Sequence, residues 1–137
     1  MFPARSAHAA GPVHAQLDAE KLQVYAVAIQ FQTLAAALSP KGQAVLRDQL
    51  ERASLSIVLN IAEGAGQRSR PSKNRFYSIA RGSANECAAV LDLLRVRGLA
   101  SEAACSQGRE LLVRIVQMLT KLQQRMVGRG EARDALA

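Results

Sequence analysis

Apolar residues recur at steps of three and four over most of the chain, and glycine or proline interrupts this spacing at only three places. Such spacing puts the apolar side chains on one face of an α-helix. The interruptions, at residues 39–42, 64–71 and 98–101, divide the chain into four helical segments. No sustained alternation of apolar and polar residues and no Asn-Gly or Asp-Gly turn indicates a strand. We therefore predict an all-α fold.

The four predicted helices have similar lengths. The first covers residues 16 to about 38, and the second runs from about residue 43 to the Gly64–Gly66 pair. Ser69 or Ser72 caps the third, which ends near Gly98, and Ser101 opens the fourth. The predicted buried line of the third helix is Phe76, Ile79, Ser83, Cys87, Val90, Leu91 and Leu94.

Helices of 20–25 residues would be roughly 30–37 Å long, and short links between them favour antiparallel neighbours. We predict an antiparallel up-down-up-down four-helix bundle over residues 16–128. A disordered N-terminal tail is expected over 1–15 and a polar C-terminal tail over 129–137. A helical solenoid is the lesser alternative, because no repeat of 30–45 residues is visible.

Two of the predicted helices are apolar on more than one face. The first helix has a line through Leu22, Tyr25 and Ile29 and another through Ala28 and Phe31. The fourth carries extra aliphatic residues, namely Leu111, Val113, Val116, Met118 and Val127. A monomeric bundle needs about one apolar stripe on each helix, so the excess predicts self-association. The alternative is a scatter of surface aliphatics.

The net charge of +7 is concentrated in the second half of the chain. Residues 1–67 hold five basic and five acidic side chains, whereas residues 68–137 hold thirteen and six. Between Gly64 and Asn85 there is no acid but five bases: Arg68, Arg70, Lys73, Arg75 and Arg81. This asymmetry predicts an anionic partner, such as RNA, DNA, an acidic protein or anionic lipid. A merely solvated charge run remains the alternative.

A second group of polar residues borders the apolar stripes of the second and third helices. It consists of Arg52, Asn60, Glu63, Ser83 and Glu86. In antiparallel helices these side chains would meet across one seam, with Gly82 allowing close approach of the backbones. Buried polar groups must hydrogen-bond one another, with Arg52 as the counter-charge. We interpret the group as a structural seam rather than an active site.

The sequence offers little for catalysis or for cofactors. The two histidines, His8 and His14, both lie in the predicted tail, and there is no Glu-x-x-His pair, which argues against a metal site or a nucleophilic triad. "GAGQRSR" has neither the strand nor the terminal Gly-Lys-Ser/Thr of a phosphate loop. Cys87 and Cys105 are expected to be free thiols. Without a membrane-length apolar run or a signal peptide, we expect a cytoplasmic protein with no membrane or small-molecule partner, no cofactor and no enzyme activity.

The stretches "ASLSIVLNIAEGAG" and "RFYSIARGSANE" resemble the 23S rRNA intervening-sequence protein family, also called the four-helix-bundle protein family. The resemblance is specific over about residues 45–94. It rests on Arg52, Ser56, Ile57, Asn60, Ile61, Ala62, Glu63, Gly64, Phe76, Gly82, Ser83 and Glu86. The sequence departs from the family at Val58, where proline is frequent, and in its extra N-terminal tail.

The resemblance implies a small bacterial cytosolic bundle, and some members of the family assemble as rings of five. A related branch, the accessory variability determinant of diversity-generating retroelements, is a basic pentamer that works beside a reverse transcriptase and RNA. The resemblance implies no catalytic residue. We therefore expect a non-enzymatic homo-oligomer, most readily a pentamer, that binds nucleic acid through its basic run with little sequence specificity. A scaffold for an acidic protein partner is the alternative function.

Overall fold

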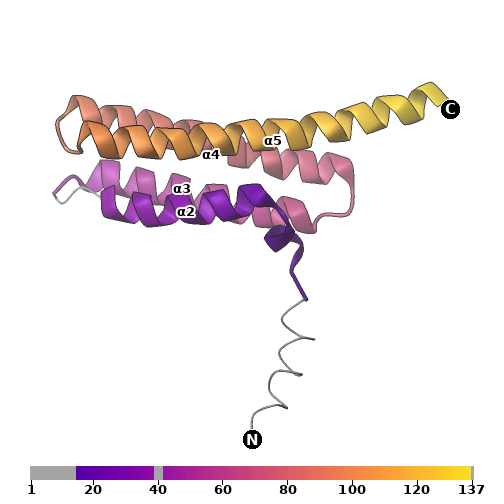
Figure 1. The fold of residues 1–137 in the computed structure, drawn as a ribbon, viewed down its shortest axis with the longest axis horizontal. Coiled ribbons are helices and arrows are strands. Elements are labelled where there is room, and N and C mark those ends of the chain that lie inside the picture. Colours follow the sequence, from indigo (N-terminus) through magenta and orange to yellow (C-terminus); the bar gives the residue numbers. More distant parts are fainter. Residues whose placement is uncertain (1–14, 39–41, 137) are drawn as a thin grey trace, which may run out of the picture.

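The computed structural model describes residues 15–38 and 42–136, with side chains described as far as residue 126. A short 3₁₀ turn, η1 (Asp18–Lys21), precedes four α-helices, namely α2 (Gln23–Leu38), α3 (Ala44–Gly66), α4 (Arg70–Val96) and α5 (Glu102–Leu136) (Figure 1). Each α-helix packs against its two neighbours and not across the diagonal. The part of the chain that the structure describes contains no strand. The predicted all-α four-helix bundle is confirmed.

The two outer helices differ from their predicted limits. The first helix begins at Gln23 rather than near residue 16, because Leu22 is extended (φ −95°, ψ 127°) and separates α2 from η1. In η1 the carboxylate of Glu20 accepts a hydrogen bond of 2.9 Å from the backbone N–H of Leu17. At the other end, α5 continues to Leu136, beyond the predicted limit of 128. The tail predicted over residues 1–15 lies, except for Ala15, outside the described residues.

Local signals fix both ends of α4. Ser69 is the N-cap, and its Oγ accepts a hydrogen bond of 3.2 Å from the backbone N–H of Ser72. Beyond the C-terminal end, Gly98 has a φ of +69°, a left-handed conformation that glycine adopts easily. This conformation lets Leu99 N–H bond the Leu94 carbonyl at 2.8 Å, while Gly98 N–H bonds the Arg95 carbonyl at 3.1 Å. The pair of bonds is a Schellman motif, which satisfies carbonyls that the helix leaves free.

The core lies along the axis between the four helices. Its largest fully buried side chains include Phe31, Ile57, Ile61, Leu94, Ile115 and Leu119. The buried line predicted for α4 is correct from Ser83 onward but wrong before it. Tyr77 and Ala80 face the core, whereas Phe76 is half-buried and Ile79 is 42% exposed. The reason is that Gly64 of α3 has no side chain and leaves room for the ring of Tyr77.

Much of the predicted excess apolar surface is covered within the chain. Ala28 and Phe31 of α2 are buried, as is Leu111 of α5. Ile29 stays 44% exposed, and α3 adds an exposed pair that the sequence analysis did not single out, Leu55 and Leu59. None of the described helices is both long and apolar enough to cross a membrane.

Candidate nucleic-acid interface

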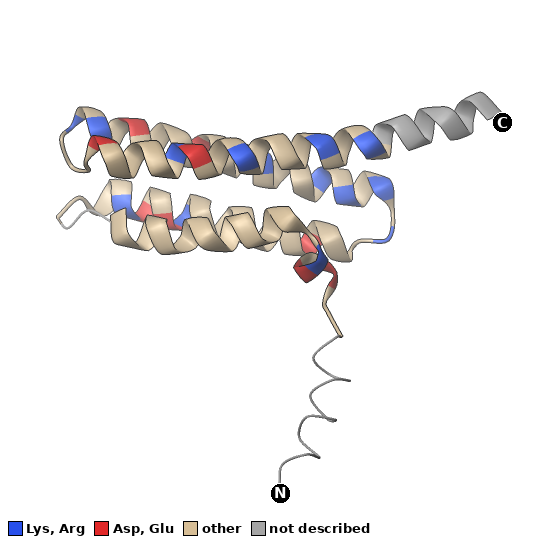
Figure 2. Cartoon of the chain, in the orientation of Figure 1, with Lys and Arg blue, Asp and Glu red and all other residues tan. Residues whose placement is uncertain are grey.

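The basic run lies at one end of the bundle, on the turn between α3 and α4 and on the first turns of α4 (Figure 2). Arg68 and Arg75 are exposed and Arg70 is half-buried. The first turn of α4 contains no acidic residue. Within the described residues, no hydrogen bond or ion pair involves the side chain of Arg68 or Arg70. These two guanidinium groups are therefore not engaged within the described chain and are available to an anion.

Lys73, by contrast, has a partner inside the chain. Its Nζ donates to the carbonyl oxygens of Ala65 at 2.8 Å and of Gly64 at 3.3 Å. Both carbonyls belong to the last turn of α3, where the helix supplies few N–H partners, although that of Gly64 also accepts from the backbone N–H of Gln67 at 3.2 Å. A lysine in this position also interacts favourably with the negative end of the helix dipole. Lys73 therefore holds the end of α3 against the start of α4.

Arg81 is also held by an internal contact. Its Nη1 donates to Oε1 of Gln123 at 2.9 Å and to Oγ1 of Thr120 at 3.3 Å, both on α5. Gln123 is 8% exposed and its Nε2 donates in turn to Oδ1 of Asn74 at 2.9 Å and to Oγ of Ser78 at 2.7 Å. These residues form a polar network that ties α4 to α5. Arg81 is therefore a weaker candidate for phosphate contact than Arg68 or Arg70.

Sequence reasoning missed this network, although one signal was present. Gln123 follows Leu119 by four positions, where the apolar spacing of the helix calls for an aliphatic residue. An amide on a buried stripe requires hydrogen-bond partners from a neighbouring helix. Which residues supply them depends on the register between α4 and α5, which the sequence does not give.

Arg75 points along its own helix. Its guanidinium lies 5.6 Å from the centre of the Phe76 ring, within the range of a cation–π interaction. The ring limits the freedom of the side chain while leaving the charge in solvent. Arg75 therefore joins Arg68 and Arg70 as a cation at this end of the bundle that no acid of the described residues neutralises.

A second basic row lies on α5 beside the first. Residues 111–126 contain Arg114, Lys121 and Arg125 and no acid. The hydrogen bond between Gln123 and Asn74 places this part of α5 next to the start of α4. Together with the five bases of the run, residues 64–85 and 111–126 contain eight cations and no acid.

The predicted polar seam exists between α3 and α4, with a different membership. Arg52 and Glu86 form an ion pair across it. One turn further along α3, Ser56 and Ser83 share a hydrogen bond of 2.7 Å. The Nδ2 of Asn60 donates to the Ser56 carbonyl at 2.9 Å and thereby supports this contact from within α3. The structure brings together four of the five predicted residues, and Ser56 completes the set.

Three details of the predicted seam are wrong. Glu63 does not reach α4, because its carboxylate lies on the exposed face of α3, 3.5 Å from Nε2 of Gln67. Gly82 is exposed and open space surrounds it, so Gly64 rather than Gly82 allows the close approach of α3 and α4. The Arg52–Glu86 pair is not buried, since 59% and 40% of the two side chains are exposed.

The described residues offer little reactive chemistry. Cys87 is fully buried, and this burial, with a smaller contribution from Glu86 opposed by Arg52, raises the pKa of its thiol to about 12. Burial also raises the pKa of Cys105, whose Sγ donates to the Leu91 carbonyl at 3.6 Å. Protonated thiols are poor nucleophiles and poor metal ligands. In the described part of the chain no three His, Cys, Asp or Glu side chains gather as they would around a metal, and His8 and His14 lie outside it.

Comparison with known proteins adds one finding. The family model described as "23S rRNA-intervening sequence protein" matches residues 20–121. The match extends from η1 into α5 and includes both the polar seam and the basic run. It confirms the family suggested by the seam residues and covers well over half of the chain. No curated protein matches the sequence.

Proposed function

Since the chain belongs to the 23S rRNA-intervening sequence protein family, we propose that it acts as a non-enzymatic, oligomeric bundle that binds nucleic acid. The proposed contact is the basic end around the α3–α4 turn. We place the protein in the cytoplasm and assign it neither a cofactor nor a small-molecule substrate. The polar seam and the Gln123 network hold the helices in register, and the remaining exposed cations supply the function.

The observation that carries the proposal is the charge at the N-terminal end of α4. Arg68 and Arg70 lie beside the positive end of the helix dipole, with no acid in the first turn. Cations there are unfavourable for the isolated helix by a few tenths of a kcal/mol each, since the dipole favours negative charge. Repulsion of this kind is relieved when an external anion binds. Phosphate groups have the charge and the acceptor oxygens to do so.

The same end gives little means of reading a base sequence. Aromatic residues make up 4% of the chain, and Phe76, the aromatic side chain beside the exposed arginines, lies half-buried beneath Arg75. Base stacking on an aromatic platform is thus disfavoured. We therefore propose that phosphate contacts give affinity and that sequence specificity is low. In an assembly of several copies the weak contacts of each copy add through multivalency.

Charge removal at matched sites tests the proposal. One variant carries Arg68→Ser with Arg70→Ser, and the control carries Arg97→Ser with Arg109→Ser at the opposite end of the bundle. Lys73 and Arg81 are kept, because both hold helices together. Binding to a generic RNA duplex is measured by fluorescence anisotropy between 50 and 300 mM salt.

The wild type and the control are expected to lose affinity steeply with salt. In the Arg68/Arg70 variant each lost phosphate contact should reduce the slope of log affinity against log salt by about 0.9. Equal slopes for this variant and the control would contradict the proposed interface. A wild type without salt-dependent binding would remove the nucleic-acid role altogether.

A further inference from the structure

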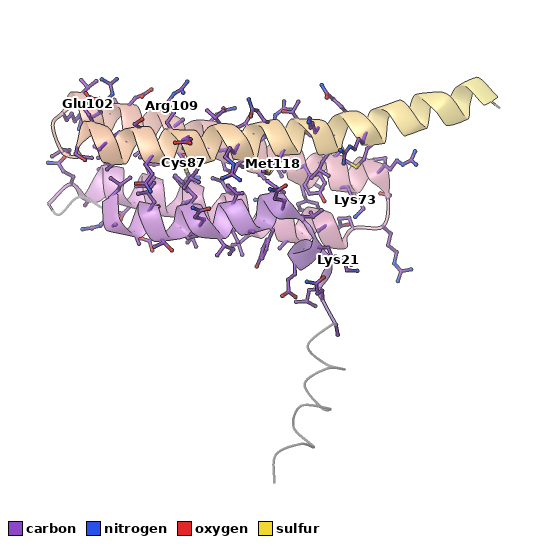
Figure 3. All side chains as sticks on the ribbon, in the orientation of Figure 1. Lys21, Lys73, Cys87, Glu102, Arg109 and Met118 are labelled. Carbon is purple, nitrogen blue, oxygen red and sulfur yellow. The ribbon has the colours of Figure 1, made fainter. Side chains whose placement is uncertain are left out.

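A basic groove with an apolar floor runs between α2 and α5. One part, of about 390 Å³, has Leu22, Met118 and Leu122 on its walls, and Lys121 and Arg125 also line it. It continues along α5 as a more open hollow of about 740 Å³ beside Arg114, Val116 and Lys121. Among the residues that the structure describes, no acid lines either part. Of the residues labelled in Figure 3, Met118 of α5 and Lys21 of η1, just before α2, lie on its two sides.

The outer face of α3 has the complementary character. Leu55 and Leu59 lie one turn apart and are 45% and 60% exposed. Asp48 and Glu51 precede them and Glu63 follows them at helical spacing, and all three acids are exposed. We name this face, defined by these five residues, the α3 stripe. Two bases lie beside it: Arg47 pairs with Asp48 of the stripe at 3.6 Å, and Arg52 pairs with Glu86 of α4.

The α3 stripe of a chain cannot enter the groove of the same chain. α3 and α5 stand at opposite corners of the bundle, and their backbones nowhere approach each other closely. We infer that the α3 stripe of one copy docks in the α2–α5 groove of a second copy. This inference rests on the oligomer in the proposed function and names the surfaces that form it.

Both chemistry and dimensions support this pairing. The leucines would cover the apolar floor, and Met118 can adapt its shape to them. Along α3, Glu51 and Glu63 are separated by about 18 Å, and along α5, Arg114 and Arg125 are separated by about 16 Å, at 1.5 Å per residue. The acids of one helix can therefore face the bases of the other over the same length.

Other occupants fit less well. A nucleic-acid backbone would pair with the cations but would leave the aliphatic side chains of the groove unused. None of the described residues that line the groove is aromatic, so bases would find no ring for stacking. The first fourteen residues of the chain include Arg5 and no acid, so they lack the charge to pair with the groove. The groove requires a helix that is both acidic and apolar, and α3 is such a helix.

The contact is heterologous, because two different surfaces of the same protein meet. Contacts of this kind produce a ring when the rotation between copies closes, and a filament when it does not. Arg68 and Arg70 belong to neither surface, so they would stay exposed in the assembly.

Two complementary variants test the inference. The groove variant carries Lys121→Glu with Arg125→Glu, and the stripe variant carries Leu55→Asp with Leu59→Asp. Leu55 and Leu59 are 45% and 60% exposed, and Lys121 and Arg125 lie on the exposed face of α5. The fold should therefore survive, and circular dichroism checks this. Arg97→Glu with Arg109→Glu is the charge-matched control. Sedimentation velocity of the full chain at micromolar concentration gives the mass.

The wild type and the control should assemble, and each of the two variants alone should be monomeric. A mixture of the two should form heterodimers with one copy of each variant. The intact stripe of the groove variant can dock in the intact groove of the stripe variant, whereas the two altered surfaces are both acidic and repel each other. If either variant still assembles, or if the mixture stays monomeric, the inferred contact is wrong. A monomeric wild type would overturn the oligomer as well, whereas the Arg68/Arg70 experiment tests nucleic-acid binding separately.

Discussion

Gly64 of α3 lies directly against the ring of Tyr77 of α4. A β-carbon on Gly64 would be 2.7 Å from Cε1 and 2.8 Å from Cδ1 of the ring. Because Tyr77 is 4% exposed and packed within the core, its ring has little room to move away. This contact fixes the distance between α3 and α4 next to the turn that carries the exposed arginines.

Substitution of Gly64 by alanine should therefore destabilise the bundle. Overpacking of this kind costs roughly 1–3 kcal/mol, which exceeds the gain of up to about 1 kcal/mol in helix propensity. Gly82→Ala is the matched control, since open space surrounds Gly82 within α4. It should stabilise the protein by about 0.5–1 kcal/mol. Urea unfolding followed by circular dichroism measures both, and a stabilising Gly64→Ala would disprove the close contact.

The exposed ion pair of the seam should contribute little. Glu86→Ala is expected to lower the free energy of unfolding by less than about 1 kcal/mol, because solvent screens a pair as exposed as this one. The effect should shrink further in 1 M salt, where the Debye length is about 3 Å. A loss of 3 kcal/mol or more, the range typical of broken buried pairs, would show that the pair is shielded from water.

Gln123→Ala should be more costly than Glu86→Ala. It removes the shared partner of Arg81, Asn74 and Ser78 from a buried position. Loss of these part-buried hydrogen bonds costs about 1–3 kcal/mol in total, and the cavity left at the buried position of Gln123 adds to this. Gln124→Ala on the exposed face of α5 is the control and should stay within about 0.5 kcal/mol of the wild type. Equal urea midpoints for the two variants would contradict the network.

Alkaline pH should weaken the fold through Cys87. Its pKa is raised from 9.0 to about 12 by burial, so the folded state keeps the proton that the unfolded chain releases. The stability from this group is complete below pH 9 and declines as pH rises toward 12. At pH 10.5 the loss is on the order of 2 kcal/mol, at 1.36 kcal/mol per pH unit.

Urea unfolding of the wild type and of Cys87→Ala at pH 7 and pH 10.5 measures this effect. The wild type should lose more stability between the two pH values than the variant does, since Tyr77 and Cys105, whose pKa values are also raised, are common to both proteins. Parallel losses would show that the thiol does not titrate on unfolding in this range.

The sequence predicted those parts of the fold that depend on local signals. The number of helices, the three turns and the caps by Ser69 and Ser101 follow from apolar spacing and from residues close in sequence. Sequence alone cannot tell whether Phe76 or Tyr77 enters the core, because both are aromatic and they occupy adjacent positions. A contact with Gly64, more than ten residues away, decides which of them enters the core.

The contacts of the candidate site were also predictable only in part. The sequence could predict a seam that contains Arg52, Ser83 and Glu86, because antiparallel neighbouring helices bring the faces that carry these residues together. The internal contacts of Lys73 and Arg81 could not, since long flexible side chains can reach partners on another helix or turn outward. Charge counting alone assigned all five bases to the interface, whereas the tertiary register ties Lys73 and Arg81 to partners within the chain.

The short connection between α3 and α4 also affects the order in which the protein is made. These helices form the most extensive pair in the bundle and are joined by residues 67–69 alone. A loop of about ten residues closes in roughly 10–100 ns, so the hairpin can form as soon as both helices exist. Synthesis of the 35 residues of α5 follows at about 5–20 residues per second. In every growing chain the apolar face that α4 turns toward α5 is therefore exposed for seconds, and this is the interval in which aggregation competes with folding.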